Sequence, residues 1–185
     1  NQRAEGFEYL LVIPNDTAFR VWADTLARFR NEQGIKTGIV TLDEIGGNTS
    51  SAIEAYLVNA VNNWEIPPAA VLFMADYGTS ADNRIISPVY DNYCISDNLM
   101  ADFNNDGLPE IATARMTARD AGQLAEMVRK AINYERNPVM DASFYDKPVT
   151  ALGWQTERWF QICSEAISGY FSNSGKNPVR INDVY

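Results

Sequence analysis

The sequence of 185 residues contains no histidine. A Ser-His or Cys-His catalytic pair therefore cannot be completed within this chain, and the commonest zinc ligand is missing as well. Only two cysteines are present, Cys94 and Cys163, and their wide separation matches neither a metal-binding spacing nor a redox pair. This pattern favours two separate buried thiols over a disulfide.

Long apolar runs and positive charge are also scarce. No apolar run reaches about 18 residues, so we predict no membrane-spanning helix, and the polar residues 1–5 do not resemble a signal peptide. With 15 Lys and Arg against 24 Asp and Glu, the formal net charge is -9. We therefore expect no nucleic-acid partner, and cations are the more natural charged ligands of this chain.

Short apolar runs alternate with helical periodicities in the first half of the chain. Residues 9–13, 36–41 and 69–74 indicate strands buried in a parallel sheet. Between them, apolar side chains at three- and four-residue steps predict helices over residues 19–29 and 53–64. Strand, helix and strand within about 30 residues form a βαβ unit with a right-handed crossover. We therefore predict an α/β fold of three layers, a parallel sheet flanked by helices.

The last third of the chain predicts a second unit. A helix whose expected buried stripe runs from Ala121 to Tyr134 ends at residues 136–138. Residues 139–147 after it have no apolar period and indicate a connection. Residues 148–153 and 179–181 predict strands on either side of a last helix, whose expected buried stripe is Trp159, Ile162, Cys163, Ala166, Ile167 and Tyr170. We expect one subdomain over residues 1–138, and over 139–185 a connection and the truncated start of a second α/β subdomain. A longer protein is expected.

An acidic loop carries the most informative local chemistry of the sequence. Its oxygen-bearing side chains alternate, and a glycine that permits a sharp turn follows them. This spacing matches positions 1, 3, 5 and 6 of the calcium-binding loop template D-x-[DN]-x-[DN]-G. The expected calcium ligands are Asp102, Asn104, Asp106, the carbonyl of Leu108, and Glu110.

The loop departs from an EF-hand at its end. Position 12, where an EF-hand places a bidentate glutamate, is Thr113, so Glu110 would close a shorter loop that leads into a strand. The alternative is an Asx-rich, solvated turn whose carboxylates accept hydrogen bonds from backbone amides without any metal. A further candidate is Asp76, which follows a predicted buried strand. Open α/β sheets bind ligands at this C-terminal end of their strands. The alternative is that Asp76 only orders the next turn.

Several motifs in this order resemble the gingipain family of secreted cysteine peptidases. They are the helix end and strand start at residues 31–37, the acidic loop continuing into residues 109–112, and the helix end at residues 133–137. The resemblance covers roughly residues 9–137. It implies a caspase-like fold of two α/β subdomains side by side, structural calcium, and a secreted or cell-surface location.

The resemblance also implies where catalysis would lie. The family's catalytic Cys and His belong to the second subdomain, downstream of the matched region, so peptide or protein substrates would be cleaved by a part missing here. This segment alone is then predicted to be inactive, and Cys163, within a helix, is not its nucleophile. Glu157 could line an acidic pocket for a basic substrate side chain, or be an ordinary first-turn helix charge.

A different class of function stays open. The same fold could serve as a non-catalytic, calcium-stabilised binding or scaffold module. A carboxylate-dependent hydrolase would need two acids facing one cleft, and no spacing in the sequence supports that.

Overall fold

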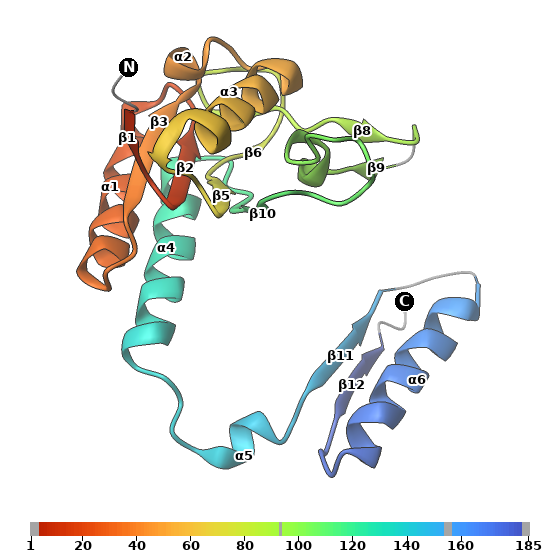
Figure 1. Cartoon of the computed structure of the whole chain (residues 1–185). Coiled ribbons are helices and arrows are strands. Elements are labelled where there is room, and N and C mark those ends of the chain that lie inside the picture. Colours follow the sequence, from red (N-terminus) through yellow and green to blue (C-terminus); the bar gives the residue numbers. More distant parts are fainter. Residues whose placement is uncertain (1–3, 93, 154–156, 183–185) are drawn as a thin grey trace. The chain divides into compact units, whose positions relative to one another are not determined.

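The structure, a computed structural model, describes residues 4–92, 94–153 and 157–182 (Figure 1). The chain divides into two compact units, residues 1–135 and 136–185. We refer to them as unit 1 and unit 2. The division lies close to the boundary expected at residues 138 and 139.

Unit 1 is built on a four-stranded parallel sheet in the order β10-β5-β2-β3. These strands are β2 (Tyr9–Ile13), β3 (Thr37–Thr41), β5 (Ala70–Phe73) and β10 (Ala112–Arg115). The central strands β2 and β5 are almost wholly buried, which explains their continuous apolar sequence.

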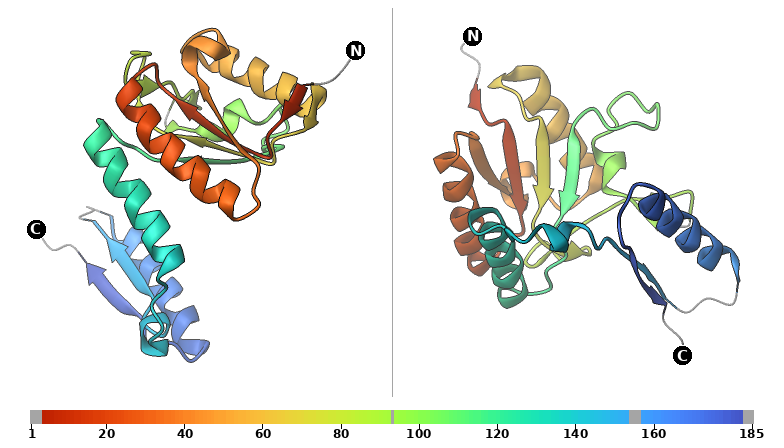
Figure 2. Two further views of the ribbon diagram at one scale, coloured as in Figure 1. Left: turned by 90° about the vertical axis from the view of Figure 1, so that its left-hand side faces the viewer. Right: turned by 90° about the horizontal axis from the view of Figure 1, so that it is seen from below.

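Helices cover both faces of this sheet, so unit 1 has the three layers that the sequence predicts. On one face lie α1 (Thr17–Glu32) and α4 (Ala121–Arg136), and on the other lies α3 (Ser50–Asn63) (Figure 2). The Arg129 guanidinium stacks over the Trp22 ring at 4.6 Å, which joins α4 to α1. From β2 the chain moves to β3 on one side and then to β5 on the other side of β2. With right-handed crossovers, this change of direction places the two connections on opposite faces of the sheet. The predicted α/β class is confirmed.

Short elements surround the sheet. The N-terminal β1 (Ala4–Gly6) pairs in parallel with β4 (Trp64–Ile66), and α2 (Leu42–Ile45) follows β3 directly. Trp64, expected on the second helix, begins β4 instead, because its extended backbone (ψ 151°) ends α3.

The long segment after β5 also holds regular structure. It contains the pair β6 (Asp76–Tyr77) and β7 (Arg84–Ile85), the antiparallel pair β8 (Val89–Tyr90) and β9 (Cys94–Ile95), and the short helix η1 (Asp97–Met100).

Arg115 ties this segment to the sheet. Its guanidinium donates two hydrogen bonds to the Asp97 carboxylate, at 2.8 and 2.7 Å. The remaining N–H groups donate to the carbonyls of Ala75, Ile85 and Ile86, at 2.9 to 3.2 Å. All five donors of the side chain are thereby satisfied, which is what a buried guanidinium requires.

Unit 2 is a single βαβ unit with one short extra helix. It comprises α5 (Ala142–Tyr145), β11 (Val149–Leu152), α6 (Trp159–Asn173) and β12 (Val179–Asn182), and the two strands are parallel. Helix α6 turns small polar side chains toward β11. Ser164 and Ser168 are buried there, and the Ser168 hydroxyl is hydrogen-bonded to that of Thr150 at 2.9 Å.

The burial expected for the last helix and for the cysteines is wrong. On α6, Trp159 and Tyr170 are 67% and 76% exposed, and Cys163 is exposed as well. The small hydroxyl side chains face β11, so the apolar stripe points the other way. Cys94 is exposed on β9, and Tyr134 is 53% exposed at the end of α4.

No helix within the described residues is both long enough and apolar enough to cross a membrane.

Candidate metal centre

The acidic loop lies between η1 and β10, at the N-terminal end of β10. Its tight turns depend on left-handed backbone at Asn105 (φ 61°) and Gly107 (φ 89°). Asparagine and glycine are the residues that adopt this conformation with least strain. The sequence thus provides the turn residues where the chain needs them.

Side-chain to backbone hydrogen bonds hold the loop in shape. The buried Asp102 carboxylate accepts from the amides of Asp106, at 3.1 Å, and Gly107, at 2.9 Å. Across the loop, Glu110 accepts from the Phe103 amide at 2.5 Å and from the Asn104 side-chain amide at 2.6 Å. These bonds draw both ends of the loop around its centre.

Three carboxylates meet at this centre. One oxygen each from Asp102, Asp106 and Glu110 lie within 4.8 Å of one another. No lysine or arginine among the described residues forms an ion pair with any of them. Like charges this close repel by about 1 kcal/mol per pair even in bulk water. A divalent cation would remove that repulsion.

The donor set suits a hard cation. Carboxylate and amide oxygens are the ligands of Ca²⁺ and Mg²⁺, and neither sulfur nor imidazole is present in this loop. Asn104 lies beside Glu110, although its side-chain oxygen accepts from the Asp106 amide at 2.9 Å. Leu108 donates its amide to Asp106 at 2.9 Å, and the ligand role of its carbonyl stays a prediction. The residues present therefore fit calcium.

Asp76 does not join this cluster. Strands β5 and β10 are parallel and in register from Ala70 with Ala112 to Phe73 with Arg115. The acidic loop precedes β10 and Asp76 follows β5. They therefore lie at opposite ends of these parallel strands, about 10 Å or more apart. Asp76 accepts from the Tyr77 amide and pairs with Arg119 at 3.2 Å, which is a turn-ordering role.

Glu157 lies in unit 2 and does not belong to the carboxylate cluster. It lies at the bend just before α6 and is exposed. Trp154, which precedes Glu157 by three residues, lies outside the described residues. The proposed acidic pocket around Glu157 stays a prediction.

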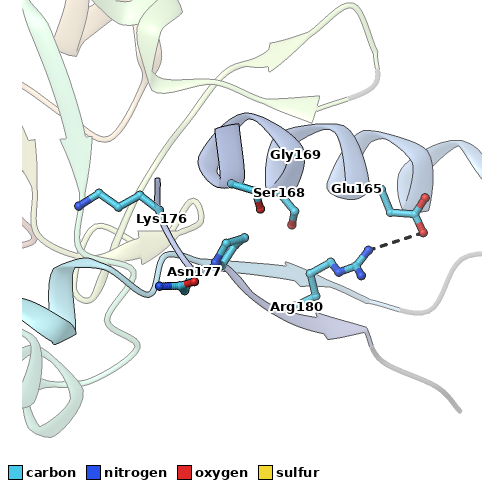
Figure 3. A pocket seen from close by; sticks show the side chains of 8 residues that line it. Glu165, Ser168, Gly169, Lys176, Asn177 and Arg180 are labelled. Atoms are coloured by element: carbon cyan, nitrogen blue, oxygen red, sulfur yellow. Dashed lines mark ion pairs between the residues drawn. The ribbon is translucent and has the colours of Figure 1, made fainter. Parts of the chain in front are cut away.

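A polar hollow of about 590 Å³ opens in unit 2 between α6 and the turn that leads to β12 (Figure 3). Two cations line it, and each has an acidic neighbour: Lys176 pairs with Asp146 at 2.8 Å, and Arg180 with Glu165 at 3.9 Å. The balanced charges give the hollow no preference for an anion, and no predicted site residue lines it.

Sequence reasoning missed the Arg115 cluster. The sequence analysis gives Asp97 no role, and its carboxylate is the counter-ion of the buried Arg115 guanidinium. A signal was present, since a lone arginine at the end of an apolar strand needs such a partner. The partner of Arg115 is Asp97, 18 residues earlier in the chain, and only the folded structure identifies it.

Comparison with known proteins gives a consistent result. The model of peptidase family C25 matches residues 2–182. Lys-gingipain of Porphyromonas gingivalis is 25% identical to this chain over 132 residues, which is 68% of this chain and 8% of that protein. The chain therefore spans less than a tenth of the length of the curated relatives that it matches.

Two solved structures share the fold. The Arg-specific cysteine proteinase gingipain R superposes with a TM-score of 0.73 at 15% identity, over 98% of this chain and 42% of that chain. The complex of Porphyromonas gingivalis RgpB pro- and mature domains gives a TM-score of 0.73 at 16% identity, over 94% and 41%.

Proposed function

This chain belongs to peptidase family C25, and from that membership we propose that it is the N-terminal part of a secreted or cell-surface gingipain-like cysteine endopeptidase. The observation that carries the proposal is the match over residues 2–182, combined with the complete lack of histidine. The family's thiolate and imidazole would then come from the chain beyond residue 185.

In such an enzyme the downstream cysteine attacks the peptide carbonyl as a thiolate, and the histidine protonates the leaving amine. Unit 1 contributes a rigid support rather than reacting groups. Cys163 has no histidine partner in this chain and lies on the outer side of a helix, so it does not act as the nucleophile.

An activity assay tests the proposal. The full-length protein is expected to cleave peptides after a basic residue, the class named for Lys-gingipain and for the Arg-specific gingipain R. Both Lys and Arg peptides should be tried, with and without a thiol alkylating agent. The 185-residue chain should cleave neither.

Two results would reject the peptidase proposal. Turnover by the 185-residue chain that Cys163→Ser abolishes would place the nucleophile here. Alternatively, a full-length protein that lacks a downstream Cys and His and cleaves nothing would favour the non-catalytic, calcium-stabilised module.

We further propose that the acidic loop holds a structural calcium ion. The support is the oxygen-only donor set and the three unneutralised carboxylates within 4.8 Å. An ion that binds only the folded chain, present at a hundred times its dissociation constant, stabilises it by about 2.7 kcal/mol. For a unit of this size that corresponds to a rise of roughly 5–15 °C in melting temperature.

The calcium test uses charge-removing variants that keep the shape of the loop. Asp106→Asn with Glu110→Gln should abolish the calcium-dependent rise in melting temperature, measured by calorimetry in calcium and in chelator. In chelator the variant should be as stable as the parent or more so, because repulsion is relieved. A matched control is Asp82→Asn with Glu65→Gln, two exposed acids that do not belong to the cluster.

The control should respond to calcium as the parent does. If the parent melts at the same temperature in calcium and in chelator, the loop is a metal-free Asx turn.

A further inference from the structure

Unit 2 leaves its apolar side chains in solvent. None of its described apolar residues is buried; the buried side chains are Thr150, Ser164 and Ser168. Thirteen of its large hydrophobic residues are exposed: Val139, Met140, Phe144, Tyr145, Val149, Trp159, Phe160, Ile162, Ile167, Tyr170, Phe171, Val179 and Ile181. Isolated exposed apolar residues are ordinary, whereas a contiguous apolar patch marks an interface, so the question is which of these residues share one surface.

Helix α6 shows which surface is involved. The side toward β11 carries small hydroxyl groups, and the Ser164 hydroxyl has no hydrogen-bond partner among the residues that the structure describes. Another side of the helix carries an apolar surface that we call the outer face of α6: Trp159, Phe160, Ile162, Cys163, Ala166, Ile167, Tyr170 and Phe171. Steps of three and four residues place these side chains in one band along the helix.

The size of the outer face matches a protein interface. An aromatic side chain buries roughly 150–250 Å². Weighted by the exposed fractions, from 37% for Phe171 to 76% for Tyr170, the outer face presents roughly 600 Å². That is at the top of the range for a patch on a monomer and near the roughly 800 Å² that each partner contributes to a stable interface.

We propose that the outer face of α6 is a docking surface for the chain that follows residue 185 in the full-length protein. The proposal rests on the proposed function, under which a longer peptidase exists. The matched gingipain R chain is more than twice as long as the part that this chain covers, so there is enough polypeptide to supply an apolar partner. A segment that begins just after β12 also has the smallest loop-closure cost for reaching α6.

A second copy of this chain is the less suitable occupant. Residues 1–135 contain 10 basic and 19 acidic residues, so they carry the whole net charge of -9, and pairing two copies would bring these charges together. A segment of the same polypeptide meets no such repulsion from unit 2, which has five basic and five acidic residues.

Cys163 provides a native probe, because it lies on the outer face and is exposed. The full-length protein and the 185-residue chain are each labelled with a maleimide under native conditions, and labelling is followed by peptide mass spectrometry. We expect Cys163 to react rapidly in the 185-residue chain and roughly tenfold or more slowly in the full-length protein. Cys94 reports the reactivity of an exposed thiol in each sample.

Three outcomes would overturn the proposal. Labelling of Cys163 at the same rate in the full-length protein as in the short chain would contradict the proposal directly. Protection already present in the short chain at all concentrations would mean that the chain covers its own face. Protection that grows with the concentration of the short chain would mean self-association.

A pair of variants gives an independent measurement. Trp159→Glu with Tyr170→Glu should lower the melting temperature of the full-length protein by several degrees and leave that of the 185-residue chain nearly unchanged. The matched control is Val21→Glu with Tyr134→Glu, which are 59% and 53% exposed on helices of unit 1. The control should change neither protein, and equal effects of the two pairs would contradict docking on α6.

These results separate the two proposals. Protection of Cys163 in a full-length protein without peptidase activity would support docking and reject the proposed function. Full activity with an unprotected Cys163 would do the reverse.

Discussion

Unit 1 buries its apolar side chains in one shared core, whereas unit 2, built from the same kind of βαβ motif, leaves its own on the surface. In unit 1 the core extends from Leu10 on β2 to Val128 on α4, through both faces of the sheet. In unit 2 the helix contacts β11 through hydroxyl groups. A βαβ motif therefore does not by itself make a core; enough strands and a second helical layer must be present.

The two units also differ in charge and in how their ion pairs are enclosed. Unit 1 carries all of the net charge, and it encloses Arg115 and Asp97 at 8% and 16% side-chain exposure. Unit 2 is neutral, and Arg180 and Glu165 lie 3.9 Å apart at 51% and 41% exposure. Substitutions placed at equivalent features of the two units can test each contrast.

The largest expected effect comes from truncating the core. Phe19→Ala in α1, where the side chain is 1% exposed, should lower the free energy of unfolding by about 3–5 kcal/mol. Phe160→Ala in α6, where the side chain is 48% exposed, should lower it by less than about 1 kcal/mol in the 185-residue chain. Urea unfolding followed by circular dichroism measures both, and similar losses would refute the difference in packing.

A smaller effect is expected from the buried ion pair. Asp97→Asn leaves the Arg115 guanidinium without its counter-ion and should cost about 3 kcal/mol, with faster hydrogen exchange across residues 78–98. Glu165→Gln removes the corresponding charge of the exposed pair in unit 2 and should cost about 0–1 kcal/mol. If residues 78–98 keep their protection in Asp97→Asn, Arg115 does not hold that segment.

The smallest effect concerns pH. The Arg30 guanidinium donates hydrogen bonds to Glu135 at 2.6 and 2.7 Å, and this contact lowers the pKa of the Glu135 carboxyl. A lowered pKa in the folded state gives stability that is present above the ordinary glutamate value of about 4.3 and is lost as the pH falls through the folded value.

Glu135→Gln should therefore lower the melting temperature slightly at pH 7, and its difference from the parent should vanish in acid. The control is Asp146→Asn, which removes the charge of the Lys176 partner in unit 2. The Asp146 side chain is 50% exposed, more than that of Glu135 at 34%. A difference that grows as the pH falls would contradict the assigned contact.

Much of unit 1 could be predicted from short stretches of sequence. The run at residues 9–13 is apolar enough to be recognised as a buried strand, and Asp16 caps α1 by accepting from the Ala18 amide. The spacing of Asp102, Asp106 and Glu110 likewise identified a cluster that the structure brings within 4.8 Å. Whether this cluster binds calcium stays a prediction.

The errors have a common physical cause. Periodicity shows that one side of α6 is apolar, but it does not show whether that side faces the unit's own strands. The thiols of Cys94 and Cys163 were expected to be buried because their residue type favours an interior, but residue type likewise does not show which surface of an element the fold covers.

By itself, the sequence determined the main strands and helices of the sheet of unit 1, the turn residues of the acidic loop, and the impossibility of a histidine-dependent reaction within these 185 residues. Those properties depend on neighbours a few residues apart, whose steric and hydrogen-bonding preferences act locally. Only the tertiary structure decided that Arg115 meets Asp97, and that α6 turns its apolar side away from its strands. Such choices balance desolvation and packing between segments that are distant in the chain, so no local pattern records them.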